Sequence, residues 1–266
     1  MPDPLLLVLL GWLVVFAAMT ALWFYQLRTG DSAIVDVAWA SGVGLLALLY
    51  ALRTAGDNGL RKAFVMAVVL VWATRLSLYV WVRFRSMPDG RYDAMKEKWG
   101  ERAQPRMFLF YQFQAVACLL FSLPMLAAIL NPNPICWLDY LGVALGVLAI
   151  GGESLADWQL HRFRKNAANK GTVCREGLWN YSRHPNYFFE WLHWWAYVLF
   201  SISYPLGWLT ILGPMAMLFF ILRVTGIPPS EQQALKSRGD AYRDYQKTTN
   251  AFFPWFPKRS VQAQGS

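Results

Sequence analysis

The sequence predicts an all-α, polytopic membrane protein with about seven transmembrane helices. Its 266 residues are 56% hydrophobic and include 14 Trp, whereas soluble globular domains are about 45 to 50% apolar. Long apolar runs recur along the chain, and strongly basic segments separate several of them. Such a composition suits a chain that buries its apolar surface in lipid.

Seven apolar runs approach the roughly 20 residues that a membrane-crossing helix needs. They are 5–25, 33–52, 63–82, 108–130, 135–155, 187–203 and 205–222. The last two are short, so they could tilt or form a hairpin. The first run has no basic segment before it and no small-residue cleavage site after it, which indicates a retained helix and not a signal peptide.

The distribution of Lys and Arg predicts the orientation. These residues are concentrated in segments 83–107 and 156–186 and in the tail after Arg223. Cytosolic loops carry an excess of such cations, so all three segments are predicted to face the cytosol. With seven crossings, the N-terminus is outside and the C-terminus cytosolic, in the inner membrane if the source is a bacterium. The connection that holds Arg53 and Arg61 violates the rule.

Residues 157–190 are densely polar and basic, although they lie between two apolar runs. Cations in this segment suit phosphate groups, and its carboxylates and amides suit sugar hydroxyls. The mixture fits a nucleotide better than a lipid headgroup. The plain alternative is that these cations only enforce the positive-inside rule.

Four stretches of the chain resemble one family. Gly177–Glu190, with its Arg-His-Pro-Asn-Tyr core, resembles the cofactor-binding signature of the steroid 5α-reductases, which are membrane-embedded, NADPH-dependent reductases. Segment 157–165 resembles the family's Asp-to-Arg-Lys stretch, and the tail 241–257 resembles its Tyr-x-x-Tyr…Phe-x-Pro ending. Segment 74–79 resembles the helix that supplies the catalytic Tyr. The resemblance is closer in the C-terminal half.

The resemblance implies one reductase domain over residues 1–266. Residues 1–107 would carry the substrate and catalytic groups, and residues 108–266 the NADPH-binding loops and the tail. The side chains implied to contact NADPH are Asp157, Arg164, Lys165, Asn169, Lys170, Tyr181, Arg183, His184, Asn186, Glu190, Glu231, Tyr242 and Tyr245. Two stretches, 166–176 and 231–238, are too divergent from the family for individual contacts to be assigned.

Asp36 and Tyr79 are the predicted catalytic residues. Arg75 and Tyr79 are four residues apart and share a helix face, which an acid from the second apolar run could meet. The resemblance implies that Tyr79, assisted by Asp36, donates a hydrogen bond to the carbonyl oxygen of an apolar enone. That enone would be a Δ4-3-oxosteroid or a similar compound entering from the bilayer, with hydride from NADPH added to its β carbon. The plain alternative is a structural ion pair between Asp36 and Arg75.

Two other functions stay open. Isoprenylcysteine carboxyl methyltransferases share a similar Arg-His-Pro-x-Tyr motif, and in that interpretation segment 231–245 helps to hold S-adenosylmethionine. A sterol-binding membrane protein without catalysis is the third interpretation. The cations Arg164, Lys165 and Arg183 favour a polyanionic dinucleotide over a cationic sulfonium.

Several common sites are not predicted. Cys118, Cys136 and Cys174 have no metal-ligand spacing, so neither a metal site nor a disulfide is expected. Gly42 and Gly44 do not extend to a dinucleotide fingerprint and lack a βαβ context. Since the cations lie next to membrane spans, the expected partners are the lipid membrane and an apolar small molecule, and not nucleic acid.

Overall fold

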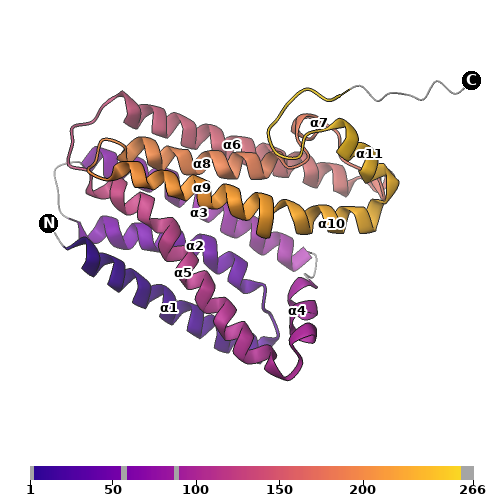
Figure 1. Cartoon of the computed structure of the whole chain (residues 1–266), viewed down its shortest axis with the longest axis horizontal. Coiled ribbons are helices and arrows are strands. Elements are labelled where there is room, and N and C mark those ends of the chain that lie inside the picture. Colours follow the sequence, from indigo (N-terminus) through magenta and orange to yellow (C-terminus); the bar gives the residue numbers. More distant parts are fainter. Residues whose placement is uncertain (1–2, 55–58, 87–89, 259–266) are drawn as a thin grey trace, which may run out of the picture. The chain divides into compact units, whose positions relative to one another are not determined.

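The computed structural model describes residues 3–54, 59–86 and 90–258 (Figure 1). Within these ranges all regular structure is helical and no strand occurs, which confirms the predicted all-α class. The α-helices are α1 (Pro4–Thr29), α2 (Ile34–Arg53), α3 (Gly59–Ser86), α4 (Arg91–Trp99), α5 (Ala103–Leu130), α6 (Trp137–Lys165), α7 (Leu178–Tyr181), α8 (Pro185–Ser201), α9 (Leu212–Phe219), α10 (Ile227–Arg238) and α11 (Asp240–Thr248). Shorter helical turns are η1 (Gly100–Arg102), η2 (Ala167–Asn169), η3 (Gly207–Ile211) and the π-turn η4 (Phe220–Val224).

Six helical segments in the described part of the chain are long and apolar enough to cross a membrane. They are Pro4–Thr29, Ile34–Arg53, Gly59–Arg85, Arg91–Leu130, Trp137–Lys165 and Gly207–Arg238. The protein is therefore an integral, multi-pass membrane protein. The remaining predicted crossing corresponds to α8, whose 17 residues extend over about 25 Å, at the lower limit of the roughly 17 to 25 residues that a crossing helix needs.

The helices extend further than the apolar runs. α6 continues ten residues beyond the predicted limit at position 155, so the first part of the segment predicted as a polar loop, 156–186, is helical. Likewise α4 forms inside the predicted basic loop 83–107. Gln, Leu, Arg and Lys are good helix formers. In addition, the positive charges of Arg164 and Lys165 in the last turn of α6 interact favourably with the negative C-terminal end of the helix dipole. Apolarity marks where the lipid ends, not where the helix ends.

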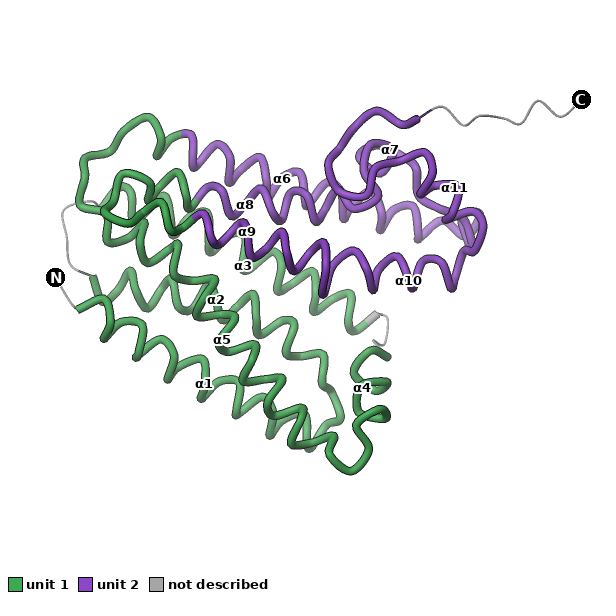
Figure 2. Tube along the Cα trace, viewed as in Figure 1, with its two compact units in different colours: residues 1–140, 197–210 green, residues 141–196, 211–266 purple. Residues whose placement is uncertain are grey.

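The chain divides into two compact units (Figure 2). Unit 1 comprises residues 1–140 and 197–210, and unit 2 comprises residues 141–196 and 211–266. In unit 1, α2 packs against α1, α3 and α5, and α5 also packs against α1 and α4. Unit 2 contains most of α6 and α8, the helices α7 and α9 to α11, and the C-terminal tail.

Two glycines of α2 let neighbouring helices approach closely. A Cβ atom on Gly44 would lie 2.8 Å from the Cβ of Ala73 on α3, and one on Gly42 would lie 3.0 Å from the Sγ of Cys118 on α5. Small residues at such crossings are typical of helix packing in membranes. The Gly42 and Gly44 pair is therefore a packing feature of unit 1, in line with the missing nucleotide fingerprint.

Arg61, which violates the positive-inside rule, is fully buried in unit 1. Its side chain is 1% exposed, and its Nε and Nη2 atoms donate to the two carboxylate oxygens of Asp139 at 2.6 and 2.9 Å. The remaining guanidinium N–H groups donate to the carbonyl oxygens of Asn131, Asn133 and Pro134. Because this cation is neutralised inside the fold, it does not count against the predicted orientation as a free loop cation would.

Candidate functional site

α7 is held against α6 at the start of residues 177–185 of unit 2, called the Arg-His-Pro segment below. Gly177 has a φ of +56°, which favours glycine, and a Cβ atom there would clash with the side-chain amide of Gln159 on α6. The Oε1 of Gln159 accepts the backbone N–H of Leu178 at 3.0 Å. The indole N–H of Trp179 donates to the carbonyl oxygen of Ala156 at 2.9 Å. These contacts fix the segment that leads into α8.

α8 begins at Pro185, two residues before the apolar run 187–203, because Pro is favoured at the first helical position. The backbone N–H of Phe188 donates to the carbonyl oxygen of His184 at 3.2 Å, which closes the first turn. Glu190 consequently lies in the second turn of α8. Asn186 and Glu190 remain four residues apart on one helix face.

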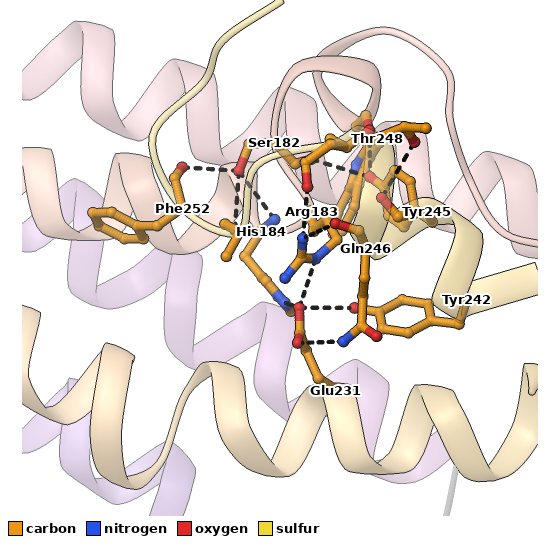
Figure 3. Close-up of polar contacts among 12 residues, drawn as sticks. Ser182, Arg183, His184, Glu231, Tyr242, Tyr245, Gln246, Thr248 and Phe252 are labelled. Atoms are coloured by element: carbon orange, nitrogen blue, oxygen red, sulfur yellow. Dashed lines mark hydrogen bonds and ion pairs between the residues drawn. The ribbon is translucent and has the colours of Figure 1, made fainter. Parts of the chain in front are cut away.

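A group of side chains around Glu231 joins α10, α11 and the Arg-His-Pro segment (Figure 3). Its Oε1 accepts from the Nε of Arg183 at 2.7 Å and lies 3.3 Å from both the Nε2 of His184 and the hydroxyl of Tyr242. Its Oε2 accepts from the Nε2 of Gln246 at 2.7 Å. These five residues are called the Glu231 hub below. Four of them were predicted to contact a cofactor, and the structure brings them together as partners of one another.

Arg183 also cross-links the chain through its other donors. Its Nη1 atom donates to the carbonyl oxygens of Gln246 at 3.1 Å and Thr249 at 2.6 Å, and its backbone N–H donates to Asn250 at 2.8 Å. The side chain is 11% exposed and is paired with Glu231. The positive charge of Arg183 is therefore compensated within the protein.

Tyr245 extends the same polar network into the core of unit 2. Its side chain is 1% exposed, and its hydroxyl is directed at the carbonyl oxygens of Trp179 and Ser182. The Oγ of Ser182 donates to Phe252 at 2.8 Å and accepts the backbone N–H of His184 at 3.1 Å. α11 is thus fastened to α7, to the entry of α8 and to the tail.

Burial sets the protonation of the hub. It lowers the pKa of His184, an effect that the carboxylate of Glu231 opposes only in part. The ring is therefore neutral near pH 7, and its Nε2–H faces Glu231 as a donor. Burial, followed by the charge of Glu231, raises the pKa of Tyr242, and burial raises the pKa of Tyr245. Both tyrosines stay protonated as donors.

A second polar group lies between α6 and α8. Asp157 is 4% exposed and accepts from the Nδ2 of Asn186 at 3.3 Å. The Oδ1 of Asn186 is buried and has no hydrogen-bond partner among the residues that the structure describes. Glu190, 8% exposed, accepts from the indole N–H of Trp194 at 3.2 Å. Asp157, Asn186 and Glu190 were predicted site residues, and the first two are in direct contact.

The other predicted cofactor residues lie around the C-terminal end of α6. Arg164, Lys165 and Lys170 have exposed side chains. The Nδ2 of Asn169, in η2, donates to the carbonyl oxygen of Phe163 at 3.0 Å. Tyr181 is 39% exposed at the end of α7. This end of unit 2 therefore presents cations outward, with Arg164 about two helical turns beyond the buried Asp157 on α6.

The predicted catalytic residues belong to unit 1. Asp36 lies in the first turn of α2 and accepts from the hydroxyl of Tyr92 at 2.7 Å and from Arg91 at 2.9 Å. On α3, the guanidinium of Arg75 lies 5.3 Å from the ring centroid of Tyr79, so these two residues share a face as expected. Tyr92, 5% exposed, is a partner of Asp36 that the sequence analysis missed.

Sequence reasoning also missed Gln246 and Ser182. Gln246 is four residues after Tyr242, so helical spacing places both on the face of α11 that meets Glu231, and this signal could have been used. Ser182 directly precedes Arg183, but its bonds to the tail join positions 70 residues apart. No local pattern reveals such a contact.

The fold and these polar groups define a helical, multi-pass membrane protein with buried polar networks in each unit. The chain belongs to the family described as "Protein of unknown function (DUF1295)", whose family model matches residues 22–249. That range includes every predicted site residue from Asp36 to Tyr245. No curated protein and no solved structure matches the chain.

Proposed function

We propose that this protein is an NADPH-dependent membrane reductase of the steroid 5α-reductase type. Its substrate would be an apolar enone such as a Δ4-3-oxosteroid, which partitions into the bilayer. Three features support the proposal: the resemblance over residues 157–190, the multi-pass helical architecture, and a family match that includes all the residues concerned.

The orphaned acceptor on Asn186 is the observation that carries the proposal. Its Oδ1 is buried without a partner in the described part of the chain, and an unsatisfied buried polar atom costs about 1 to 3 kcal/mol. Ribose hydroxyls and a nicotinamide carboxamide are donors that would satisfy it. Exposed cations at the end of α6 suit phosphates. The residues present therefore fit a dinucleotide.

The chain's residues take distinct parts in this proposal. Arg164 and Lys165 bind phosphate, and Asp157, Asn186 and Glu190 orient hydroxyl and carboxamide groups. The Glu231 hub holds the Arg-His-Pro segment, and with it the start of α8, in a fixed position. When bound, NADPH supplies the hydride that reduction of an enone requires.

On the substrate side, Tyr79 donates a hydrogen bond to the carbonyl oxygen, where negative charge develops during reduction. Removing one such donor typically costs about 10² to 10³ in rate. Asp36 assists from a position held by Tyr92 and Arg91. The proposed orientation puts the N-terminus outside and the C-terminus in the cytosol, where NADPH is available to the exposed end of α6.

A methyltransferase is the second candidate function, and one observation favours it. The preference for a dinucleotide rested partly on three cations, and the charge of Arg183 is compensated by Glu231. Only Arg164 and Lys165 remain as exposed charges of that set. S-adenosylmethionine carries a sulfonium cation and no phosphate, so it needs fewer cationic side chains around it than NADPH.

The test is reduction of a Δ4-3-oxosteroid panel by the full chain in detergent, without oxygen, with NADPH deuterated at C4 of the nicotinamide. We expect loss of enone to match NADPH oxidation, with deuterium on the β carbon of the product. Saturable binding of S-adenosylmethionine, with no NADPH-dependent change in any enone, would reject the reductase and favour the methyltransferase.

A further inference from the structure

Three large aromatic side chains near the C-terminus are exposed. Phe253 is 55% exposed, Trp255 67% and Phe256 73%. Together with the proline between the first two they form Phe253–Phe256, called the aromatic segment below. Contiguous exposed apolar groups on a folded protein mark an interaction site more often than chance.

Hydrogen bonds and a ring contact within unit 2 fix the aromatic segment in this exposed position. The backbone N–H of Trp255 donates to the carbonyl oxygen of Tyr181 at 2.9 Å, and that of Lys258 donates to the end of α11 at 2.8 Å. The ring of Phe253 packs on Trp191 of α8, with centroids 5.8 Å apart. The backbone is pinned on both sides, so these side chains are held outward.

The residue pattern on the exposed side of α6 indicates where unit 2 meets the membrane surface. In chain order this side of α6 carries Leu155, which is 44% exposed, Trp158, which is 54% exposed, and the exposed Arg162. The guanidinium of Arg162 lies 5.4 Å from the ring centroid of Trp158. This change from apolar to aromatic to cationic takes seven residues, about 10 Å of helix. It is the pattern of a membrane–water interface, where Trp and Tyr are enriched.

Hydrogen bonds tie the aromatic segment to this level of α6. The indole of Trp179 donates to the carbonyl oxygen of Ala156, two residues before Trp158. Tyr181, two residues after Trp179, accepts the N–H of Trp255, and its ring packs edge-on against Phe256 at 5.9 Å. The aromatic segment is therefore held near the depth at which α6 leaves the lipid.

We propose that the aromatic segment inserts into the headgroup region of the bilayer, on the membrane face where α6 ends. Aromatic rings are at home there because their apolar faces meet acyl chains while the surrounding backbone stays hydrated. The exposed Lys258 directly follows, and the net charge of +9 favours anionic headgroups. The partner is the lipid surface, whichever reaction the protein performs.

The test places a nitroxide on the aromatic segment in the full chain. Phe256→Cys is made with Cys136→Ser, since Cys118 and Cys174 are buried, and is reconstituted in phosphatidylcholine and phosphatidylglycerol vesicles. The control is Asp244→Cys on α11, whose native side chain is 64% exposed. Collisions with oxygen, which concentrates in lipid, are compared with collisions with a water-soluble nickel chelate.

We expect a several-fold higher oxygen-to-nickel collision ratio at position 256 than at position 244. Equal ratios would place the aromatic segment in water, and exclusion of both reagents would mean that protein covers it; either result overturns the proposal. Phe253→Cys repeats the measurement if the first variant does not fold. Protein without a nitroxide label gives a second check. Brominated lipids should quench more tryptophan fluorescence in the wild type than in Trp255→Phe.

Discussion

Each unit contains an arginine paired with a carboxylate and bonded to backbone carbonyls, yet the two arrangements differ. Arg61 and Asp139 are each 1% exposed and form a closed pair. Arg183 and Glu231 are 11 and 15% exposed, and Glu231 is shared with neutral donors from His184 and α11. The first pair is a buried cross-link between two side chains, whereas in the second the carboxylate is shared among several donors within the predicted site. An arginine inside a motif predicted to bind a cofactor can thus be as much a structural element as one outside it.

Asp139→Ala should have the largest effect on stability. It leaves the guanidinium of Arg61 buried without its counterion, which typically costs about 3 to 5 kcal/mol. Unfolding in mixed detergent and dodecyl sulfate micelles would measure the loss. The double variant Arg61→Met with Asp139→Leu should be less destabilised than Asp139→Ala, because no charge is left unpaired. A double variant at least as unstable as Asp139→Ala would contradict the closed-pair description.

Glu231→Gln should be destabilising by a smaller amount. The amide keeps one acceptor for the hub but removes the negative charge opposite Arg183, and a hydrogen bond to a charged group contributes about 1.5 to 3 kcal/mol. The same unfolding measurement applies. A loss as large as that of Asp139→Ala would mean that the hub is as closed as the Arg61 pair.

Nucleotide affinity tests whether the exposed cations at the end of α6 bind phosphate. Arg164→Ala with Lys165→Ala should weaken NADPH binding about tenfold or more, since charged hydrogen bonds to phosphate are lost. Arg243→Ala with Lys247→Ala removes the same charge from exposed positions on α11 and is the matched control. Fluorescence titration of NADPH measures both. Equal weakening by the two variants would show only a general charge effect.

The pH dependence of the free energy of unfolding should report the protonation of His184. Because burial lowers its folded-state pKa below the unfolded value of about 6.5, the unfolded chain binds more protons at acidic pH, and stability falls as the pH drops below about 6.5. His184→Gln should flatten this part of the stability profile. The exposed His161 provides the control substitution, His161→Gln. An unchanged profile in His184→Gln would place the acid sensitivity elsewhere.

The membrane class and the helical fold were predictable because both depend on local properties. Apolar runs locate the lipid-embedded stretches, and helical periodicity places Asn186 and Glu190, or Arg75 and Tyr79, on common faces. Helix ends were less predictable. α6 extends to Lys165 because polar helix formers continue the hydrogen-bond ladder beyond the lipid, where hydropathy carries no signal.

The candidate site was predictable as a set of residues but not as a set of contacts. Arg183 and Glu231 were both chosen as cofactor residues, yet their pairing across 48 positions depends on how α10 and α11 pack around the Arg-His-Pro segment. Tyr92 was not chosen at all, because its hydrogen bond to Asp36 spans 56 positions. Side-chain partners at such separations are selected by packing and burial.

The sequence by itself therefore determined the kind of protein, its helices and the segment in which polar chemistry is concentrated. These follow from composition and from periodicities that act over a few residues. Only the tertiary structure decided which cations are compensated and which remain exposed. The physical reason is that a buried charge must find a counterion or carbonyl oxygens wherever the fold provides them, as Arg61 does with Asp139, 78 residues further along the chain.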